Sequence, residues 1–221
     1  MFPYPIGFNT SAAAGLADID NVYSMEFDGV DDYMTTGINL GYTNYPNLSL
    51  SCWIKVDVSA LADFTTYTPV GVYTGSYPNS TPIAITHQNH VASPRVMVSV
   101  QGSGTVYSTT ELGDGNWHHI VQTCEYDASG TICNVYVDGN PTPEIVNKLL
   151  LSFAPLTRDL ILGGALTTWR LFLGSVDEVA AFDYILSTDD ITDIYNATSS
   201  GKTADLSSMS TPPLAWYRMG D

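Results

Sequence analysis

The sequence has few basic residues. Lys and Arg together number only 7, against 23 Asp and Glu, and the formal net charge is −16. Binding to nucleic acid depends on cationic side chains that displace counterions from phosphates, and anionic membrane surfaces attract the same side chains. We therefore expect neither nucleic acid nor a membrane among the partners of this chain.

Cysteine is also scarce, with Cys52, Cys124 and Cys133 as the three examples and no Cys-x-x-Cys motif. Three cysteines do not make the dense disulfide framework of a small secreted domain. Residues 1–22 lack the basic start and the apolar run of a signal peptide, and no apolar run approaches the roughly 18 residues of a membrane span. We expect the thiols to be reduced, with Cys52 buried and apart from the other two.

Short strand-like segments separated by turn residues make up most of the chain. Leu48–Val56 alternates most regularly, with apolar residues on one face and polar residues plus a Trp on the other. One segment is typical of a helix, because Ser187 or Thr188 can cap it and Asp189 and Asp190 suit its first turn. Many short strands with one short helix favour an all-β sandwich.

The segments His118–Tyr126 and Ile132–Asp138 flank Asp-Ala-Ser-Gly, a typical hairpin loop. Counting back from the centre of this loop places Cys124 opposite Cys133. Their Cα atoms should then lie within about 4.5–5.5 Å of each other.

Three segments, in this order and at this spacing, resemble the concanavalin A-like lectin/laminin-G-like family. They are SMEFDGVDDYM (24–34), the Trp-His-His segment that runs to Tyr-Val-Asp-Gly-Asn-Pro (113–141), and LFLGSVDEVAAFDYILSTDDITDIYNA (171–197). The resemblance implies an all-β fold, a two-sheet antiparallel jelly-roll sandwich with one short helix near the C-terminus.

The expected domain plan has four parts: an N-terminal arm (1–22), the jelly-roll domain (23–197), a Ser-rich linker (198–211) and a C-terminal strand that completes the sheet (212–221). In relatives a similar Leu-x-x-Trp/Tyr segment usually precedes the domain, whereas here it follows the domain. We therefore expect Leu214–Met219 to be a permuted strand. Its predicted partner is the early strand near Tyr23–Phe27, in the same subunit or in a neighbour.

Catalytic patterns are not found. Glucanases of this superfamily place their acids on one strand as Glu-x-Asp-x-x-Glu, and the chain has neither this pattern nor Gly-x-Ser-x-Gly. Asp177 and Glu178 are adjacent on a predicted strand and should face opposite ways. The sequence therefore predicts a protein that binds or builds and is not an enzyme.

Two kinds of binding site are predicted. Clustered carboxylates suit a structural Ca²⁺, with Asp28, Asp31, Asp32 and Asp177 as the candidate ligands, although the Asp28-Gly29 turn explains Asp28 without a metal. Aromatic residues near loops can stack on sugar rings, and the candidates are Tyr73, Tyr77 and Trp169.

Three further residues receive structural roles. His118 and His119 are neighbours on a strand, so they point to opposite faces and do not easily share one ion. Trp117 is expected to plug one end of the sandwich core.

The Asp-Asn-Val-Tyr-Ser stretch at 20–24 and the Trp-Tyr-Arg-Met-Gly-Asp ending resemble domains of virion proteins from tailed phages. This resemblance implies a virion structural or capsid-decoration protein, assembled in the host cytoplasm, that docks on other virion subunits or on copies of itself as a homo-oligomer. The alternative on the same scaffold is a carbohydrate-binding module for attachment to host glycans.

Overall fold

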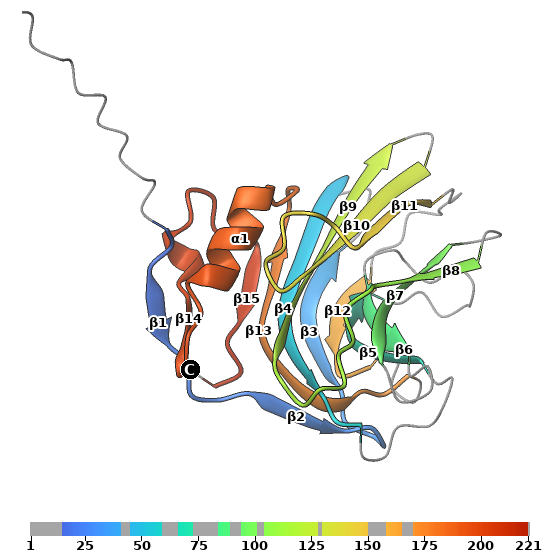
Figure 1. Cartoon of the computed structure of the whole chain (residues 1–221), viewed down its shortest axis with the longest axis horizontal. Helices are drawn as coiled ribbons and strands as arrows, with labels where there is room; N and C mark the ends of the chain where they lie inside the picture. The colour runs from blue at the N-terminus through green and yellow to red at the C-terminus, as the bar shows by residue number, and fades with distance from the viewer. Residues whose placement is uncertain are drawn as a thin grey trace, which may run out of the picture.

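The structure is a computed structural model that describes residues 15–40, 45–58, 66–72, 84–88, 94–100, 104–127, 130–149, 158–164 and 170–220. Two antiparallel sheets face each other, and a short helix with two short strands lies on the far side of one of them (Figure 1). This arrangement confirms the all-β sandwich with one helix near the C-terminus. None of the described helices is long and apolar enough to cross a membrane.

The larger sheet has seven strands in the order β11-β10-β9-β4-β13-β15, and β2 also pairs with β13. Its strands are β2 (Met25–Asp28), β4 (Asn47–Val56), β9 (His118–Asp127), β10 (Gly130–Val137), β11 (Ile145–Leu149), β13 (Leu173–Phe182) and β15 (Ala215–Tyr217).

The smaller sheet has six strands in the order β3-β12-β5-β6-β7-β8. They are β3 (Met34–Leu40), β5 (Thr66–Val72), β6 (Ala84–Gln88), β7 (Arg95–Val100), β8 (Gly104–Tyr107) and β12 (Arg158–Leu162). The main hydrophobic core contains residues from both sheets, including Ile54, Ile120 and Val176 from the larger sheet and Val70 and Leu160 from the smaller one.

Strand β4 shows how the sequence pattern produces this core. Its predicted apolar face, Leu48 to Val56 at every second residue, is buried in the main core. The opposite face is also covered at Ser49 and Ser51, which are 0% and 2% exposed. Ser49 can be buried there because its Oγ donates to the carbonyl of Tyr184 (2.8 Å) and accepts from the N–H of Leu186 (3.0 Å).

A second apolar cluster fills the space between the outer face of the larger sheet and helix α1 (Thr188–Asn196). Its buried members include Val121, Phe182, Ile191 and Leu206. The helix begins as predicted: Ser187 is the N-cap and forms a capping box with Asp190. This outer layer distinguishes the molecule from a plain two-layer sandwich.

The outer layer also includes segments that the sequence assigned to an arm and a linker. β1 (Asp18–Asp20) pairs with β14 (Lys202–Ala204), and a 3-10 helix follows at Leu206–Ser208. Thr203 and Ala204 are 2% and 1% exposed. Residues 198–211, which were predicted to be a linker, therefore contain secondary structure and buried residues.

The C-terminal strand lies in the larger sheet, but its predicted partner is wrong. β15 pairs with β13 through Val179–Ala181, and β2 pairs with the same edge of β13 through Leu173–Val176. The early strand and the late strand therefore lie end to end along one long strand and do not pair with each other. β13 has ten residues, which is enough length to hold both.

The hairpin β9–β10 has the predicted register, with Cys124 directly opposite Cys133. Cys52 lies on β4 and is buried. None of the three cysteines is in a disulfide.

Candidate functional site

A surface hollow of about 380 Å³ lies where the start of the domain, the loop before β14 and the outer face of the larger sheet meet. We call it the Trp hollow. Its lining residues are Asn21, Val22, Tyr23, Ser24, Trp53, Trp117, Asp177, Thr198, Ser199, Ser200, Gly201 and Lys202. The lining combines two indoles and a phenol ring with hydroxyl, amide, carboxylate and ammonium groups.

Trp53 is held in place by aromatic stacking. Its ring stacks on Tyr195 of α1 (centroids 5.6 Å apart, 13° between planes) and on His119 (5.1 Å, 28°). Gly139 leaves room for this stack, because a Cβ there would lie 2.5 Å from the Cβ of Tyr195. The indole is therefore fixed before any ligand arrives, which reduces the entropy lost on binding.

Trp117 forms another part of the lining. It precedes β9 and is 36% exposed, so the expectation that it plugs the sandwich core is wrong. Val22 and Tyr23 are 72% and 59% exposed, so two further large side chains are accessible at the hollow.

Asp177 supplies the carboxylate. It is 5% exposed, its Oδ2 accepts from the Nδ2 of Asn21 (3.0 Å), and its Oδ1 accepts from the N–H of Glu178 (2.8 Å). The amide of Asn21 and the N–H of Glu178 therefore fix the orientation of this carboxylate in the hollow.

The predicted opposite orientation of Asp177 and Glu178 is wrong. The pairing of β13 with β4 shifts register between Asp177 and Ala180, and Glu178 has a φ of 49°. Val176 and Val179 both belong to the main core, three residues apart. The bulge therefore puts two successive residues, Asp177 and Glu178, on the outer side of the sheet.

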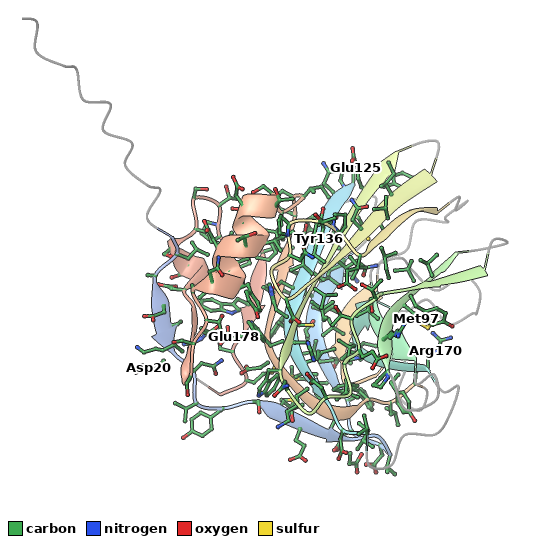
Figure 2. The ribbon with its side chains drawn as sticks, viewed as in Figure 1. Asp20, Met97, Glu125, Tyr136, Arg170 and Glu178 are labelled. Atoms are coloured by element: carbon green, nitrogen blue, oxygen red, sulfur yellow. The ribbon has the colours of Figure 1, made fainter. Side chains whose placement is uncertain are left out.

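Glu178 does not line the hollow; it lies beneath the C-terminal segment and is 3% exposed. Its Oε2 accepts from the indole N–H of Trp216 (2.5 Å), and its Oε1 lies 3.4 Å from the Nε of Arg218. Burial, with a smaller contribution from the charge of Asp177, raises the pKa of Glu178 to about 7. Figure 2 labels Glu178 and Asp20 on the side of the molecule that carries α1 and β1.

The two histidines make contacts that suit structural roles. Nδ1 of His118 lies 2.9 Å from Asp138 and its Nε2 lies 3.1 Å from Asp114, and the bond with Asp138 raises the pKa of His118. His119 is fully buried, which lowers its pKa to about 4, and its Nε2 lies 2.8 Å from the Oγ of Ser51. The pair on opposite faces matches the sequence expectation.

The predicted metal ligands fall into two places. Carboxylate oxygens of Asp28, Asp31 and Asp32 lie within 4.8 Å of one another, and all three residues are exposed. Asp177 is not with them: it is four residues along β13 from Leu173, the residue that pairs with Asp28, which corresponds to about 13 Å. Of the four predicted ligands, three form an acidic turn and the fourth belongs to the Trp hollow.

Main-chain N–H groups of the turn already occupy one carboxylate oxygen of Asp28. Its Oδ1 accepts from the N–H groups of Val30 (2.7 Å) and Asp31 (3.3 Å), and the bond from Val30 is the largest cause of its lowered pKa. The oxygen donors suit a hard cation such as Ca²⁺, which prefers six to eight of them, so waters or further groups would have to complete the coordination.

The predicted sugar-stacking residues Tyr73, Tyr77 and Trp169 lie outside the described residues. Sequence reasoning missed Trp53, Trp117, Tyr23 and Asn21. One signal was present: Trp53 stands on the polar face of the most regular strand, where a large aromatic needs a reason.

A sequence profile described as the concanavalin A-like lectin/glucanases superfamily matches residues 28–192. The chain therefore belongs to this superfamily. A search of curated protein sequences finds no match.

Solved structures with the same fold include a native heptameric SAP-like pentraxin from Limulus polyphemus (TM-score 0.54, 11% identity, 82% of this chain and 80% of that chain). A proposed carbohydrate-binding protein from Bacteroides ovatus matches with a TM-score of 0.56 and 13% identity over 94% of this chain and 53% of its own length. A Trypanosoma rangeli sialidase, in complex with 2,3-difluorosialic acid, matches with a TM-score of 0.52 and 15% identity over 78% of this chain and 27% of its own length. At these identities the likeness shows the fold alone.

Proposed function

We propose that this chain is a carbohydrate-binding module and that the Trp hollow is its binding site. The observation that carries the proposal is the meeting of Trp53 and Trp117 with the carboxylate of Asp177 in one hollow. Sugar rings offer apolar C–H faces for stacking and hydroxyls for hydrogen bonding, so a sugar site needs both kinds of group.

In the hollow, the aromatic rings can stack on a sugar and the polar groups can form hydrogen bonds with it. The indoles offer flat apolar area, and Trp53 is already fixed by its stack on Tyr195 and His119. Asp177 is oriented by the amide of Asn21 and can accept from a sugar hydroxyl. Lys202 lies 2.9 Å from Asp20 and 4.0 Å from Asp18, so its charge is largely balanced within the protein.

Charge favours neutral sugars over acidic ones. The net charge is −16, and a buried carboxylate faces the hollow. A field of this sign repels uronic and sialic acids. The proposed ligand class is therefore neutral hexose or N-acetylhexosamine oligosaccharides.

Binding without hydrolysis is part of the proposal. Asp177 and the raised pKa of Glu178 together look like an acid–base pair. However, both oxygens of Glu178 face Trp216 and Arg218, and Glu178 is not among the residues that line the hollow. A bound sugar would meet one carboxylate, whereas glycoside hydrolysis usually needs two.

The finer assignments remain predictions. A place in a virion, as a structural or decoration subunit that uses this site for attachment to host glycans, rests on the sequence resemblance. A structural Ca²⁺ at Asp28, Asp31 and Asp32 rests on the acidic turn.

The test is binding to an array of neutral and acidic oligosaccharides, followed by calorimetry on the best neutral ligand. Trp117→Ala should weaken binding by about fivefold or more, because stacking of this kind is worth on the order of 1 kcal/mol or more. Asp177→Asn should also weaken it. Tyr33→Ala is the matched control, since Tyr33 is 39% exposed and lies outside the hollow.

Two results would count against the proposal. One is the lack of binding to any neutral oligosaccharide. The other is equal affinity for the Trp117→Ala variant and the unchanged protein.

A further inference from the structure

Two cysteines face each other at a position that suits a covalent bond. In the β9–β10 ladder, Cys124 is directly opposite Cys133. The N–H of Asp138 donates to the carbonyl of His119 (2.8 Å), so that pair is of the hydrogen-bonded type. Since the two types alternate along an antiparallel ladder, Cys124 and Cys133, five residues further on, form a non-hydrogen-bonded pair.

This type of pair brings side chains closest together. Its Cα atoms lie about 4.5 Å apart, inside the range of about 4.4–6.8 Å that a disulfide spans. The two Sγ atoms are 2.8 Å apart. The backbone therefore needs no rearrangement for the bond to form.

The third cysteine is not part of this arrangement. Cys52 is opposite Ile120 on β9, four residues from Cys124, which corresponds to about 13 Å along the strand. It is 0% exposed and belongs to the same core, so it serves as an internal control for buried thiol chemistry.

We propose that Cys124 and Cys133 form a cross-strand disulfide when the chain folds in an oxidising environment, and remain a thiol pair in a reducing one. The oxidant is a small aliphatic disulfide such as glutathione disulfide. One protein thiolate attacks a sulfur of the oxidant and releases one glutathione thiolate. The second protein thiolate then attacks the protein sulfur of the mixed disulfide and releases the other.

The balance is complete: two protein thiols are oxidised, one glutathione disulfide is reduced to two thiols, and the two S–H protons pass to the released thiolates.

The burial of the two cysteines determines when the bond can form. Cys124 and Cys133 are 1% and 0% exposed, and burial raises the pKa of Cys124, so the folded protein has little reactive thiolate there. The bond forms during folding, before the second sheet closes over the pair.

The experiment compares the protein refolded from denaturant in glutathione redox buffer with the same protein refolded in dithiothreitol. Intact mass should fall by two hydrogen atoms in the first sample only, and peptide mapping should link Cys124 to Cys133. The thermal midpoint of the oxidised sample should be higher by roughly 5–10 °C, as expected for a short closed loop in a chain of this size.

Two variants make the result specific. Cys52→Ser should keep the mass change and the shift in thermal midpoint, whereas Cys124→Ser should lose both. The proposal is overturned if all three thiols are alkylated in denaturant after oxidative refolding. A link between Cys52 and either other cysteine, or a lower thermal midpoint for the Cys124–Cys133 species, overturns it as well.

Discussion

Glu178 is a carboxyl group that the fold keeps away from water, with Trp216 and Arg218 as its partners. Burial raises its pKa from 4.5 to about 7. The folded state therefore holds a proton that the unfolded state releases at lower pH. The contribution of Glu178 to stability is largest below pH 4.5 and is lost as the pH rises from about 4.5 to 7.

We predict that the thermal midpoint of Glu178→Gln falls less than that of the unchanged protein between these two pH values. The glutamine has the shape of the protonated acid and does not titrate. The measurement is a series of melting curves of both proteins from pH 4 to 8, read as the difference between them. The hydrogen bond with Asp138 raises the pKa of His118 in both proteins alike, so the titration of His118 cancels in the difference. Parallel pH profiles would contradict the assignment.

Gly139 allows a second residue-scale prediction. Its φ is +68°, and a Cβ there would meet Tyr195 at 2.5–2.7 Å. Gly139→Ala should destabilise the protein by more than about 2 kcal/mol, since left-handed strain of roughly 1–2 kcal/mol is added to a steric overlap. It should also weaken sugar binding, because Tyr195 supports Trp53.

Gly115 is the matched control for this variant. Its φ is +82°, and a Cβ there would meet nothing within 4 Å. Gly115→Ala should show the strain alone, in chemical denaturation under the same conditions. Equal losses for the two variants would mean that the contact with Tyr195 does not matter.

The acidic turn gives the third prediction. If Ca²⁺ binds Asp28, Asp31 and Asp32, added Ca²⁺ should raise the thermal midpoint and a chelator should lower it, because a ligand that binds the folded state stabilises it. Asp31→Asn should reduce the effect, and Asp205→Asn, an acid elsewhere on the surface, should leave it unchanged. A thermal midpoint insensitive to both Ca²⁺ and chelator would leave the turn as a structural feature held by the carboxylates of Asp28 and Asp32.

Among the elements, β15 depends on contacts that are far apart in the sequence. It pairs with β13, its Trp216 packs in the outer cluster, and Tyr217 Oη lies 3.5 Å from the carbonyl of Thr36. Arg218 reaches further, and its guanidinium donates to the carbonyl of Asp20 (2.5 Å). The strand thereby connects the larger sheet to β1 and to the smaller sheet.

We predict that deletion of residues 212–221 destabilises the protein by several kcal/mol. The deletion removes a sheet partner and buried aromatic area, and it leaves the carboxylate of Glu178 without Trp216 and Arg218. Trp216→Ala should show part of this loss, and Leu214→Ala, at a side chain that is 40% exposed, should show little. Equal thermal midpoints for the truncated and full chains would show that β15 is dispensable.

The elements also show which parts of the fold can be predicted. The apolar face of β4, the register of the β9–β10 hairpin and the Ser187 cap depend on neighbours in sequence, and all three were predicted. The partner of β15 was wrong because two segments share the edge of β13, and nothing local reveals that β13 is long enough for both. The placement of Asp177 and Glu178 on the same side of the sheet was missed because the bulge there needs a non-glycine residue at positive φ, which has no sequence signal.

At the scale of the whole molecule, the excess of negative charge destabilises the folded state. The chain has 23 acidic and only 7 basic residues, and its net charge of −16 causes repulsion between acidic side chains that the compact state brings together. We predict that the thermal midpoint rises as NaCl increases from about 10 mM to 150 mM, because screening shortens the range of repulsion from about 30 Å to about 8 Å. Melting at constant pH tests this, with an uncharged osmolyte at equal osmolarity as the control. A thermal midpoint that falls with salt would point instead to ion pairs as the dominant electrostatic contribution.

The end-to-end placement of β2 and β15 on one strand also matters while the chain is being made. A ribosome adds residues from the N-terminal side, and strand β13 emerges some thirty residues before β15. During that interval Val179, Ala180 and Ala181 lack their β15 partners, and the second apolar cluster lacks Trp216. The edge of β13 that pairs with β15 stays uncovered until residue 217 has been added. A pause in translation during this interval would therefore prolong the exposure of an unpaired, aggregation-prone strand edge.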